Sequence, residues 1–331
     1  MGETLIIAEA GVNHNGSFEM AKQLVDRAKE AGADFVKFQT AKLESLVSKH
    51  AEMAEYQKKN TGQKTSQKDM LRKLLLPYED FIKLSEYCKN SGIGFLSTPF
   101  DTESIYFLKE LVPFWKVPSG EITNYLYLIE IAKTSMPVVL STGMCEISEI
   151  DDAVALLKEN GTTELTLLHC NTQYPTPYED VNLHAMETLR NRYGLKVGYS
   201  DHTQGIEVPI AAVALGATII EKHFTLDHTL PGPDHKASLE PQELKEMVRS
   251  IRNIESALGS SEKKVSPSER NNIAVARKSI VAARCISKGE ILNSDNLTTK
   301  RPGTGISPMQ WNQIVGTRAV RDFEEDELIE I

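Results

Sequence analysis

Short apolar runs alternate with amphipathic stretches along the first three quarters of the chain. Runs rich in β-branched and aromatic residues predict eight strands, at 4–11, 34–40, 94–100, 114–120, 137–143, 165–171, 196–201 and 218–224. Segments between them, such as 17–32 and 147–161, carry apolar residues at helical spacing and end in glycine, which predicts helices with C-terminal glycine caps. Eight such repeats over roughly 250 residues predict an α/β fold, a closed parallel (β/α)8 barrel of the TIM type. An open doubly wound sheet is disfavoured, because no glycine-rich phosphate fingerprint follows the first run.

The pattern changes after residue 258. A polar stretch with serine, proline and charges covers 259–272 and is typical of a linker. From 273 to 331, short strand-like runs are broken by turn signals, which predicts a small β-rich module. We therefore expect a barrel domain at 1–258, a linker at 259–272 and a second domain at 273–331.

Composition excludes several classes of protein. The 331 residues are 40% hydrophobic and 25% charged, as in ordinary globular proteins. A formal charge of -9 argues against nucleic acid as a partner. Four scattered cysteines form no paired motif, and the N-terminus has no signal-peptide pattern, so we expect a cytoplasmic protein. The longest apolar run, 208–220, is shorter than the ~20 residues of a membrane helix, so no membrane association is expected.

Polar side chains gather where the predicted strands end. In a parallel barrel these ends form the face that carries active sites. Three pairs are spaced i and i+2, so that both members point to the same side of a strand. These pairs are Lys37 with Gln39, Ser200 with His202, and Glu221 with His223. The pattern predicts a polar site at this end of the barrel.

Two kinds of chemistry are indicated by these residues. His202 and His223 follow neighbouring strands, where neutral imidazoles could hold a divalent transition metal and leave positions open for substrate. The alternative is a pair of structural histidines bonded to loop carbonyls. An anion carrying phosphate and carboxylate would suit a ring of lysines and hydroxyls, formed by Lys37, Lys116, Thr98, Ser119, Ser141 and Ser200.

Ten segments of the chain resemble the bacterial sialic acid synthases. They are IAEAGVNHNG, VKFQT, FLSTPFD, KVPSGEITN, LSTGM, LHCNTQYPTPYEDVNL, GYSDHT, EKHFTLD, GPDHKASLEP and TTKRPGTGISP, and they run nearly end to end. The resemblance implies a barrel followed by an antifreeze-like (SAF) domain. It also implies a domain-swapped homodimer, in which Arg301 of one protomer completes the site of the other.

The resemblance further implies a reaction and residue roles. Phosphoenolpyruvate condenses with an open-chain N-acylated mannose-type sugar, and N-acetylmannosamine as that sugar would make the chain an N-acetylneuraminate synthase. Manganese is the expected metal, with magnesium or cobalt as alternatives, held by His202 and His223. Phosphoenolpyruvate would be bound by Lys37, Thr98, Lys116, Ser119, Ser141, Asn171 and Ser200. Either Glu9 or Glu221 would handle the attacking water, and the sugar contacts would be Gln39, Tyr174, Asp234 and Arg301.

Two departures from the family pattern leave alternatives open. Asn171-Thr172 stands where some members read Thr-Asn, and the loop after the second strand differs in length, so that Asn60 there is only one choice for a sugar contact. The sugar could instead be 2,4-diacetamido-2,4,6-trideoxymannose, which would make an N,N'-diacetyllegionaminate synthase. A non-catalytic carbohydrate-binding protein and an aldolase with a Schiff base on Lys116 or Lys222 are the other classes considered.

Overall fold

The structure is a computed structural model that describes residues 3–47 and 66–331. The chain forms two compact units, Met1–Gly259 and Ser260–Ile331. In the described part of the chain, no helix is both long and apolar enough to cross a membrane.

The first unit is an eight-stranded parallel barrel, which confirms the predicted fold. Its strands run in the order β3-β2-β1-β8-β7-β6-β5-β4. They are β1 Leu5–Gly11, β2 Phe35–Thr40, β3 Gly94–Pro99, β4 Trp115–Val117, β5 Val138–Ser141, β6 Leu165–Cys170, β7 Lys196–Asp201 and β8 Ile219–His223. Each lies within one of the eight apolar runs of the sequence.

The barrel is nearly but not fully closed. Strands β3 and β4 lie side by side at the two ends of the strand order, yet the described residues show no hydrogen-bonded ladder between them. Strand β4 has only three residues and is followed by Pro118, which has no N–H to donate. The seam therefore coincides with the shortest strand of the barrel.

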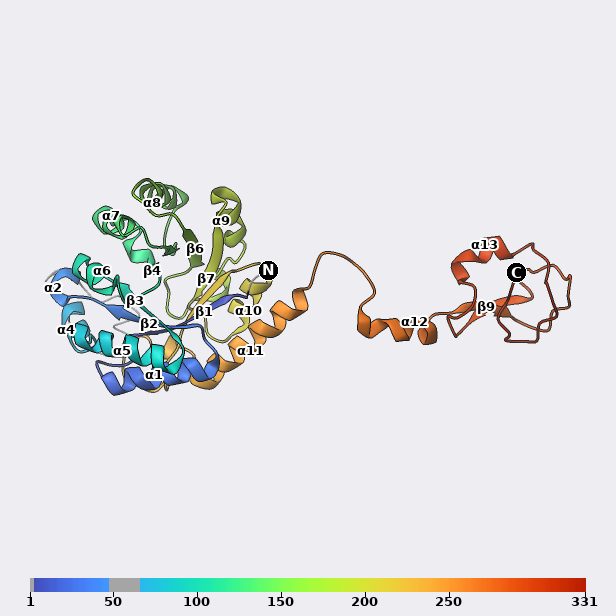
Figure 1. Cartoon of the computed structure of the whole chain (residues 1–331), viewed down its shortest axis with the longest axis horizontal. Coiled ribbons are helices and arrows are strands. Elements are labelled where there is room, and N and C mark those ends of the chain that lie inside the picture. Colours follow the sequence, from blue (N-terminus) through green and yellow to red (C-terminus); the bar gives the residue numbers. More distant parts are fainter. Residues whose placement is uncertain (1–2, 48–65) are drawn as a thin grey trace. The chain divides into compact units, whose positions relative to one another are not determined.

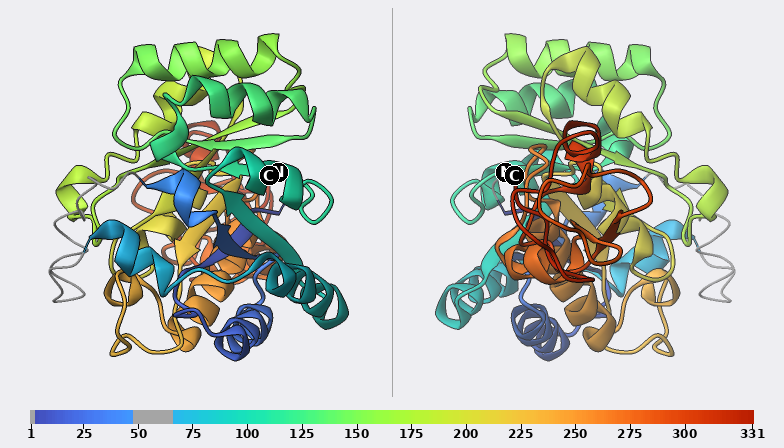
Figure 2. Two further views of the ribbon diagram at one scale, coloured as in Figure 1. Left: turned by 90° about the vertical axis from the view of Figure 1, so that its left-hand side faces the viewer. Right: turned by 90° about the vertical axis from the view of Figure 1, so that its right-hand side faces the viewer.

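Helices surround the strands, as all three ribbon views show (Figure 1, Figure 2). Ser17 and Asp101 cap two of them by accepting hydrogen bonds from Met20 N and Ser104 N, and Gly32 ends the first with a left-handed φ of 86°. The helices are α1 Phe18–Ala31, α2 Leu43–Leu46, α4 Gln67–Arg72, α5 Tyr78–Ser91, α6 Thr102–Leu108, α7 Tyr125–Lys133, α8 Ile147–Glu159, α9 Ala185–Tyr193, α10 Glu207–Ala214 and α11 Pro241–Leu258. Short 3-10 turns are η1 Ser119–Glu121, η2 Tyr178–Asp180 and η3 His235–Ala237.

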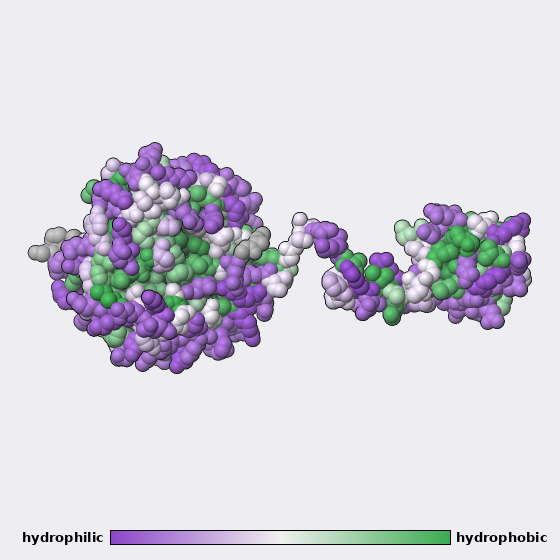
Figure 3. All heavy atoms as spheres, in the orientation of Figure 1, coloured by the Kyte–Doolittle hydropathy of each residue, from purple (hydrophilic) through white to green (hydrophobic). Residues whose placement is uncertain are grey.

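The apolar core lies between the strands and this ring of helices. Because both faces of each strand are covered, the strands are continuous apolar runs rather than alternating ones. Strands β7 and β8 approach so closely that a Cβ on Gly198 would lie 2.5 Å from the Ile219 carbonyl oxygen. One face of the unit shows apolar side chains at its centre, with polar side chains around them (Figure 3).

The second unit has a core of its own around a two-stranded antiparallel ladder. Strands β9 Ser279–Ala282 and β10 Leu297–Lys300 pair with Leu297 opposite Ala282. Buried Ile280, Leu292 and Phe323 pack beside them. The remaining elements are η4 Pro267–Glu269, α12 Arg270–Ala276, η5 Pro308–Gln310 and α13 Trp311–Ile314. Helix α12 was not expected from the sequence, and it covers residue 273, where we placed the start of the module.

A buried ion pair joins the last two barrel strands. Lys222 Nζ, with no exposed side-chain surface, contacts the Asp201 carboxylate and donates to the Thr203 carbonyl oxygen. Thr203 Oγ1 also contacts both carboxylate oxygens, at 2.9 and 3.0 Å. Removing one member of such a pair leaves the other charged and buried without a partner.

We expect Lys222→Met to lower the free energy of unfolding by about 3–5 kcal/mol, because Asp201 would lose its counter-charge. The Lys222→Met/Asp201→Asn double variant should recover part of the loss, since asparagine carries no charge. Urea unfolding measures both. Lys133→Met breaks the exposed pair with Glu130 and serves as the control, with no measurable change expected. Equal effects of Lys222→Met and Lys133→Met would contradict a structural role for the buried pair.

Candidate active site

A cavity of about 560 Å³ lies at the carboxyl ends of the barrel strands. It brings together most of the site residues predicted from the sequence: Glu9, Lys37, Gln39, Thr98, Lys116, Ser119, Ser141, Tyr174, Ser200, His202, Glu221, His223 and Asp234. A larger recess, of about 610 Å³, is lined mainly by apolar residues at the opposite ends of the strands. The chemistry-bearing side chains therefore converge on the end that the sequence indicated.

Four buried charges form the floor of the cavity. Lys37 Nζ lies 2.8 Å from Glu9 Oε2 and 3.9 Å from Glu221 Oε2. Lys116 Nζ lies 3.3 Å from Glu221 Oε1, which also accepts a 3.2 Å hydrogen bond from Ser200 Oγ. None of the four charged side chains is more than 5% exposed. The two lysines and two carboxylates thus compensate one another.

Burial is the largest influence on the pKa of both glutamates, but the outcome differs. It raises the pKa of Glu9, which Lys37 only partly offsets. For Glu221, burial is outweighed by the charges of Lys116 and Lys37, so its pKa falls to about 2. Burial also opposes the charge on Lys37, yet Glu221 and Glu9 raise its pKa. Lys37 and Glu221 are consequently held charged.

Two histidines form one wall of the cavity. The ring centroids of His202, after β7, and His223, at the end of β8, are 5.3 Å apart. Burial lowers the pKa of His202 to about 4 and that of His223 well below its usual value, so both rings are neutral. The Tyr174 ring packs against them, with centroids 4.1 Å from His202 and 5.7 Å from His223.

These imidazoles have the features of metal ligands. His202 Nδ1 donates to the Asn171 carbonyl oxygen, which leaves a lone pair on Nε2. His223 Nδ1 is buried and has no hydrogen-bond partner within residues 3–47 and 66–331. Among the described residues no group of three or more His, Cys, Asp or Glu could hold a metal ion. The residues therefore fit a cation with two protein ligands and open positions, and not a closed structural site.

Hydroxyl groups line the cavity beside the lysines. Lys37 Nζ donates to Thr98 Oγ1 at 3.1 Å, and Ser119 Oγ accepts from Gly143 N at 2.8 Å. Ser141 Oγ is buried and has no hydrogen-bond partner in the part of the chain that the structure describes. An unsatisfied buried hydroxyl costs about 1–3 kcal/mol, and a bound ligand would remove that cost.

The cavity residues that sequence reasoning missed include two beside a predicted one. Cys170 and Thr172 line the cavity, whereas Asn171, predicted in their place, does not. Asn171 Oδ1 instead accepts from Gln173 N at 2.7 Å, and its backbone holds His202. The strand register contains the signal: Cys170 is paired with Ser200, which faces the cavity. Alternation then places positions 170 and 172, not 171, on the cavity side.

For two other predicted residues, a position at the cavity stays a prediction. Arg301 belongs to the second unit, is exposed, and donates through Nε to the Ala276 carbonyl oxygen at 3.1 Å. Asn60 lies outside the described residues.

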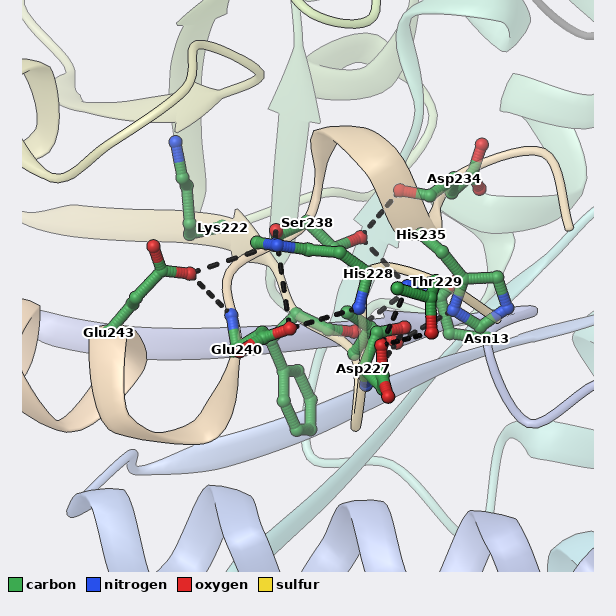
Figure 4. Close-up of polar contacts among 12 residues, drawn as sticks. Asn13, Lys222, Asp227, His228, Thr229, Asp234, His235, Ser238, Glu240 and Glu243 are labelled. Atoms are coloured by element: carbon green, nitrogen blue, oxygen red, sulfur yellow. Dashed lines mark hydrogen bonds and ion pairs between the residues drawn. The ribbon is translucent and has the colours of Figure 1, made fainter. Parts of the chain in front are cut away.

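Asp234 is held at the cavity by the connection that follows β8 (Figure 4). Asn13 Nδ2 donates to the Phe224 carbonyl oxygen at 2.9 Å and to Ser238 Oγ at 3.0 Å. Ser238 Oγ in turn donates to the Asp234 carbonyl oxygen at 2.7 Å. Burial and the nearby charge of Glu9 raise the pKa of Asp234 to about 7.

This raised pKa predicts a pH-dependent stability. Protonated Asp234 favours the folded state below about pH 4, and that contribution is lost as the pH rises through about 7. Asp234→Asn removes the titration. Its free energy of unfolding relative to the wild type should therefore increase from pH 4 to pH 8, by up to about 4 kcal/mol.

Urea unfolding of both proteins across this range measures the difference. Asp227→Asn is the matched control. Hydrogen bonds from Thr229 lower the pKa of Asp227, so its contribution to stability changes only below about pH 4, and its difference from the wild type should stay nearly constant from pH 4 to pH 8. A difference between Asp234→Asn and wild type that does not change with pH would refute the raised pKa.

The chain is similar to known proteins over nearly its whole length. Residues 24–263 match the NeuB family and residues 277–330 match the SAF domain. The N,N'-diacetyllegionaminic acid synthase of Campylobacter jejuni is 52% identical over 99% of both chains. The enzyme of the same name from Legionella pneumophila is 51% identical over 95% of this chain and 89% of that protein.

A solved structure gives the same picture of the fold. The N-acetylneuraminic acid synthetase of Leptospira borgpetersenii serovar Hardjo-bovis, in complex with citrate, is 36% identical with a TM-score of 0.71. The match covers 82% of this chain and 90% of that one. Sequence and structural similarity of this extent identify the chain as a member of the NeuB family that carries a C-terminal SAF domain.

Proposed function

We propose that this protein is an N,N'-diacetyllegionaminate synthase, which condenses phosphoenolpyruvate with 2,4-diacetamido-2,4,6-trideoxymannose and releases phosphate. The observation that carries the reaction type is the single cavity that joins Lys37 and Lys116 to two neutral imidazoles. The choice of sugar rests on the relatives at 52% and 51% identity. It replaces N-acetylneuraminate synthase, our first expectation from the motifs, which becomes the second candidate.

The anion would bind at the floor of the cavity. Lys37 and Lys116 supply the positive charge for the phosphate and carboxylate groups. Ser141 Oγ, which is buried and unpaired among the described residues, would gain a partner, and Thr98, Ser119 and Ser200 supply further hydroxyls. Ser200 and Thr98 already bond to members of the charged floor, so they can exchange those bonds for bonds to the ligand.

A cation is needed in addition to the lysines. The floor is already neutral, because two lysines face two glutamates, and the incoming anion adds negative charge. We propose His202 and His223 as ligands for a divalent cation, with manganese as the first choice and magnesium or cobalt as alternatives. Such a cation would supply Lewis-acid polarisation of the aldehyde carbonyl. Arg301 of a partner subunit is the second proposed positive charge.

Bond changes follow from the two substrates. The methylene carbon of phosphoenolpyruvate forms a bond to the aldehyde carbon, and water then adds to the carbon that bears the phosphate. One proton of that water compensates the proton taken up by the former aldehyde oxygen, which becomes a hydroxyl group. Breaking of the carbon–oxygen bond to phosphate forms the keto group, and the second proton leaves with the phosphate. Glu9 is the better choice to take the proton of water, because burial raises its pKa, whereas Lys116 and Lys37 lower the pKa of Glu221 to about 2. Gln39 Nε2 donates to Glu9 Oε1 at 3.0 Å and orients it.

The other classes of function have less support. A Schiff base on Lys222 is disfavoured, because this side chain is fully buried against Asp201 and does not line the cavity. Lys116 does line it, but its Nζ lies 3.3 Å from Glu221 Oε1 in an ion pair, so a Schiff base there would leave that buried carboxylate without this partner. A non-catalytic carbohydrate-binding protein has no need of two lysines and two neutral histidines in one cavity.

Phosphate release tests the proposed reaction. With phosphoenolpyruvate and manganese, we expect faster release with 2,4-diacetamido-2,4,6-trideoxymannose than with N-acetylmannosamine. Chelation should stop release with either sugar. Lys116→Met should lower kcat/KM at least about 100-fold, because it removes charge from the anion site, while Lys133→Met should leave it unchanged. Absence of release with both sugars would overturn the catalytic proposal, and faster turnover of N-acetylmannosamine would restore the second candidate.

Mixing of two inactive variants tests the swapped homodimer. In a hybrid of Lys116→Met and Arg301→Ala protomers, one site would combine an intact barrel with an intact Arg301. Random pairing makes about half of the dimers hybrids, each with one intact site, so the mixture should recover about a quarter of wild-type activity. Phosphate release before and after subunit exchange measures this. If Arg301 serves its own barrel, or no site at all, the exchanged mixture gains no activity.

A further inference from the structure

The wall of the cavity beside β2 is mainly apolar, whereas the floor is charged. Helix α4 places Gln67, Met70 and Leu71 along this wall, at positions i, i+3 and i+4 of one helical face. Helix α2 packs against α4, and both follow β2 in the chain (Figure 1). We call these three residues the α4 face. It combines one amide with two apolar side chains.

Packing outside the main core fixes the apolar part of the α4 face. Met70 is buried in a small cluster with Val12 and Leu74, and Leu71 packs against this cluster. Val12 lines the cavity as well. The apolar surface that a ligand meets here is therefore held in place by its own contacts.

Apolar side chains extend this wall on either side of α4. Ala41, Leu46, Val47 and Leu75 also line the cavity, from segments next to α2 and α4. A sugar hydroxyl placed against them would lose its bonds to water and gain none from these side chains. A methyl group placed there would lose nothing and would bury apolar surface.

Gln67 is the polar exception on the wall. Its side chain is half-buried at the cavity, and within residues 3–47 and 66–331 its amide makes no hydrogen bond. A side-chain amide offers both a donor and an acceptor. An acetamido group presents the complementary acceptor and donor, followed by a methyl group that Met70 and Leu71 could cover.

We propose that the α4 face selects the acceptor sugar by receiving its C4 acetamido group and C6 methyl group. N-Acetylmannosamine carries hydroxyls at both of these positions, whereas 2,4-diacetamido-2,4,6-trideoxymannose carries the amide and the methyl. The inference rests on the proposed function, because it assumes that a sugar aldehyde reacts in this cavity. It adds the residues that distinguish the two candidate acceptors.

The direction of the sugar agrees with the barrel order. The aldehyde end belongs near His202 and His223, which follow β7 and β8. The α4 face follows β2, which is separated from β7 by β1 and β8 in the sheet. An open-chain sugar with C1 at the histidines would extend its C4–C6 end past β1 toward the α4 face. Amide and methyl groups at that end would then meet a wall that combines an amide with apolar side chains.

Kinetics with both sugars on single variants test this selection. Gln67→Leu should lower kcat/KM for the diacetamido sugar about tenfold and change that for N-acetylmannosamine by less than about twofold. Leu71→Gln should shift the ratio in the same direction by giving a hydroxyl a partner. The KM for phosphoenolpyruvate should stay unchanged in both variants. Gln242→Leu makes the same chemical change at an exposed position of α11 and is the matched control.

Each outcome bears on one proposal at a time. A wild type that uses neither sugar overturns the proposed function. A wild type that uses either sugar, with a ratio that Gln67→Leu and Leu71→Gln leave unchanged, overturns the selection alone. Equal losses for both sugars do the same, because they indicate a structural role. Thermal unfolding shows whether Leu71→Gln is folded. If it is not, Gln67→Leu decides the question, because its side chain is only half-buried and the change should disturb the fold less.

Discussion

The arrangement of this barrel depends on the cost of burying charge. Lys37, Lys116, Glu9 and Glu221 are each nearly inaccessible to water, and an isolated buried charge costs several kcal/mol. They can be buried only because they meet. The register brings them together: Glu9 lies opposite Lys37 on β1 and β2, and Ser200 lies opposite Glu221 on β7 and β8. A shift of one residue along either pair would turn these charges toward the apolar layer.

The same constraint explains what could be read from the sequence. Strands covered on both faces produce apolar runs, so all eight barrel strands could be predicted, and so could the polar pairs at their ends. Prediction failed where strand alternation was not applied. Asn171 was chosen, although Cys170 is the register partner of the cavity residue Ser200 and Thr172 lies two positions further on the same side. The partner of Lys222 could not be predicted either, because Asp201 lies 21 positions away on another strand. The periodicity of the sequence predicts which face of a strand a side chain lies on, but not which side chains it contacts there.

Irregular segments set the remaining limit. The open seam between β3 and β4, helix α12 and the α4 face have no strong periodic signal, because short elements are shaped by tertiary packing more than by propensity. Yet part of the cavity wall is built from such segments. The strand ends form a floor suited to phosphoenolpyruvate chemistry, whereas the connections after β1 and β2 form the wall that an acceptor would meet. Motifs at strand ends can therefore identify the family and still leave the sugar undecided.

The charge balance also separates the roles of the two substrates. Before any ligand binds, the lysines and glutamates of the floor cancel, and both histidines are neutral. Phosphoenolpyruvate changes that balance and must arrive with, or be followed by, positive charge. A neutral sugar does not change it, so its recognition has to come from shape, hydrogen bonds and apolar contact. Substitutions in the apolar wall can therefore change the acceptor sugar without changing the charged floor that the reaction uses. One reaction can in this way be paired with different acceptors.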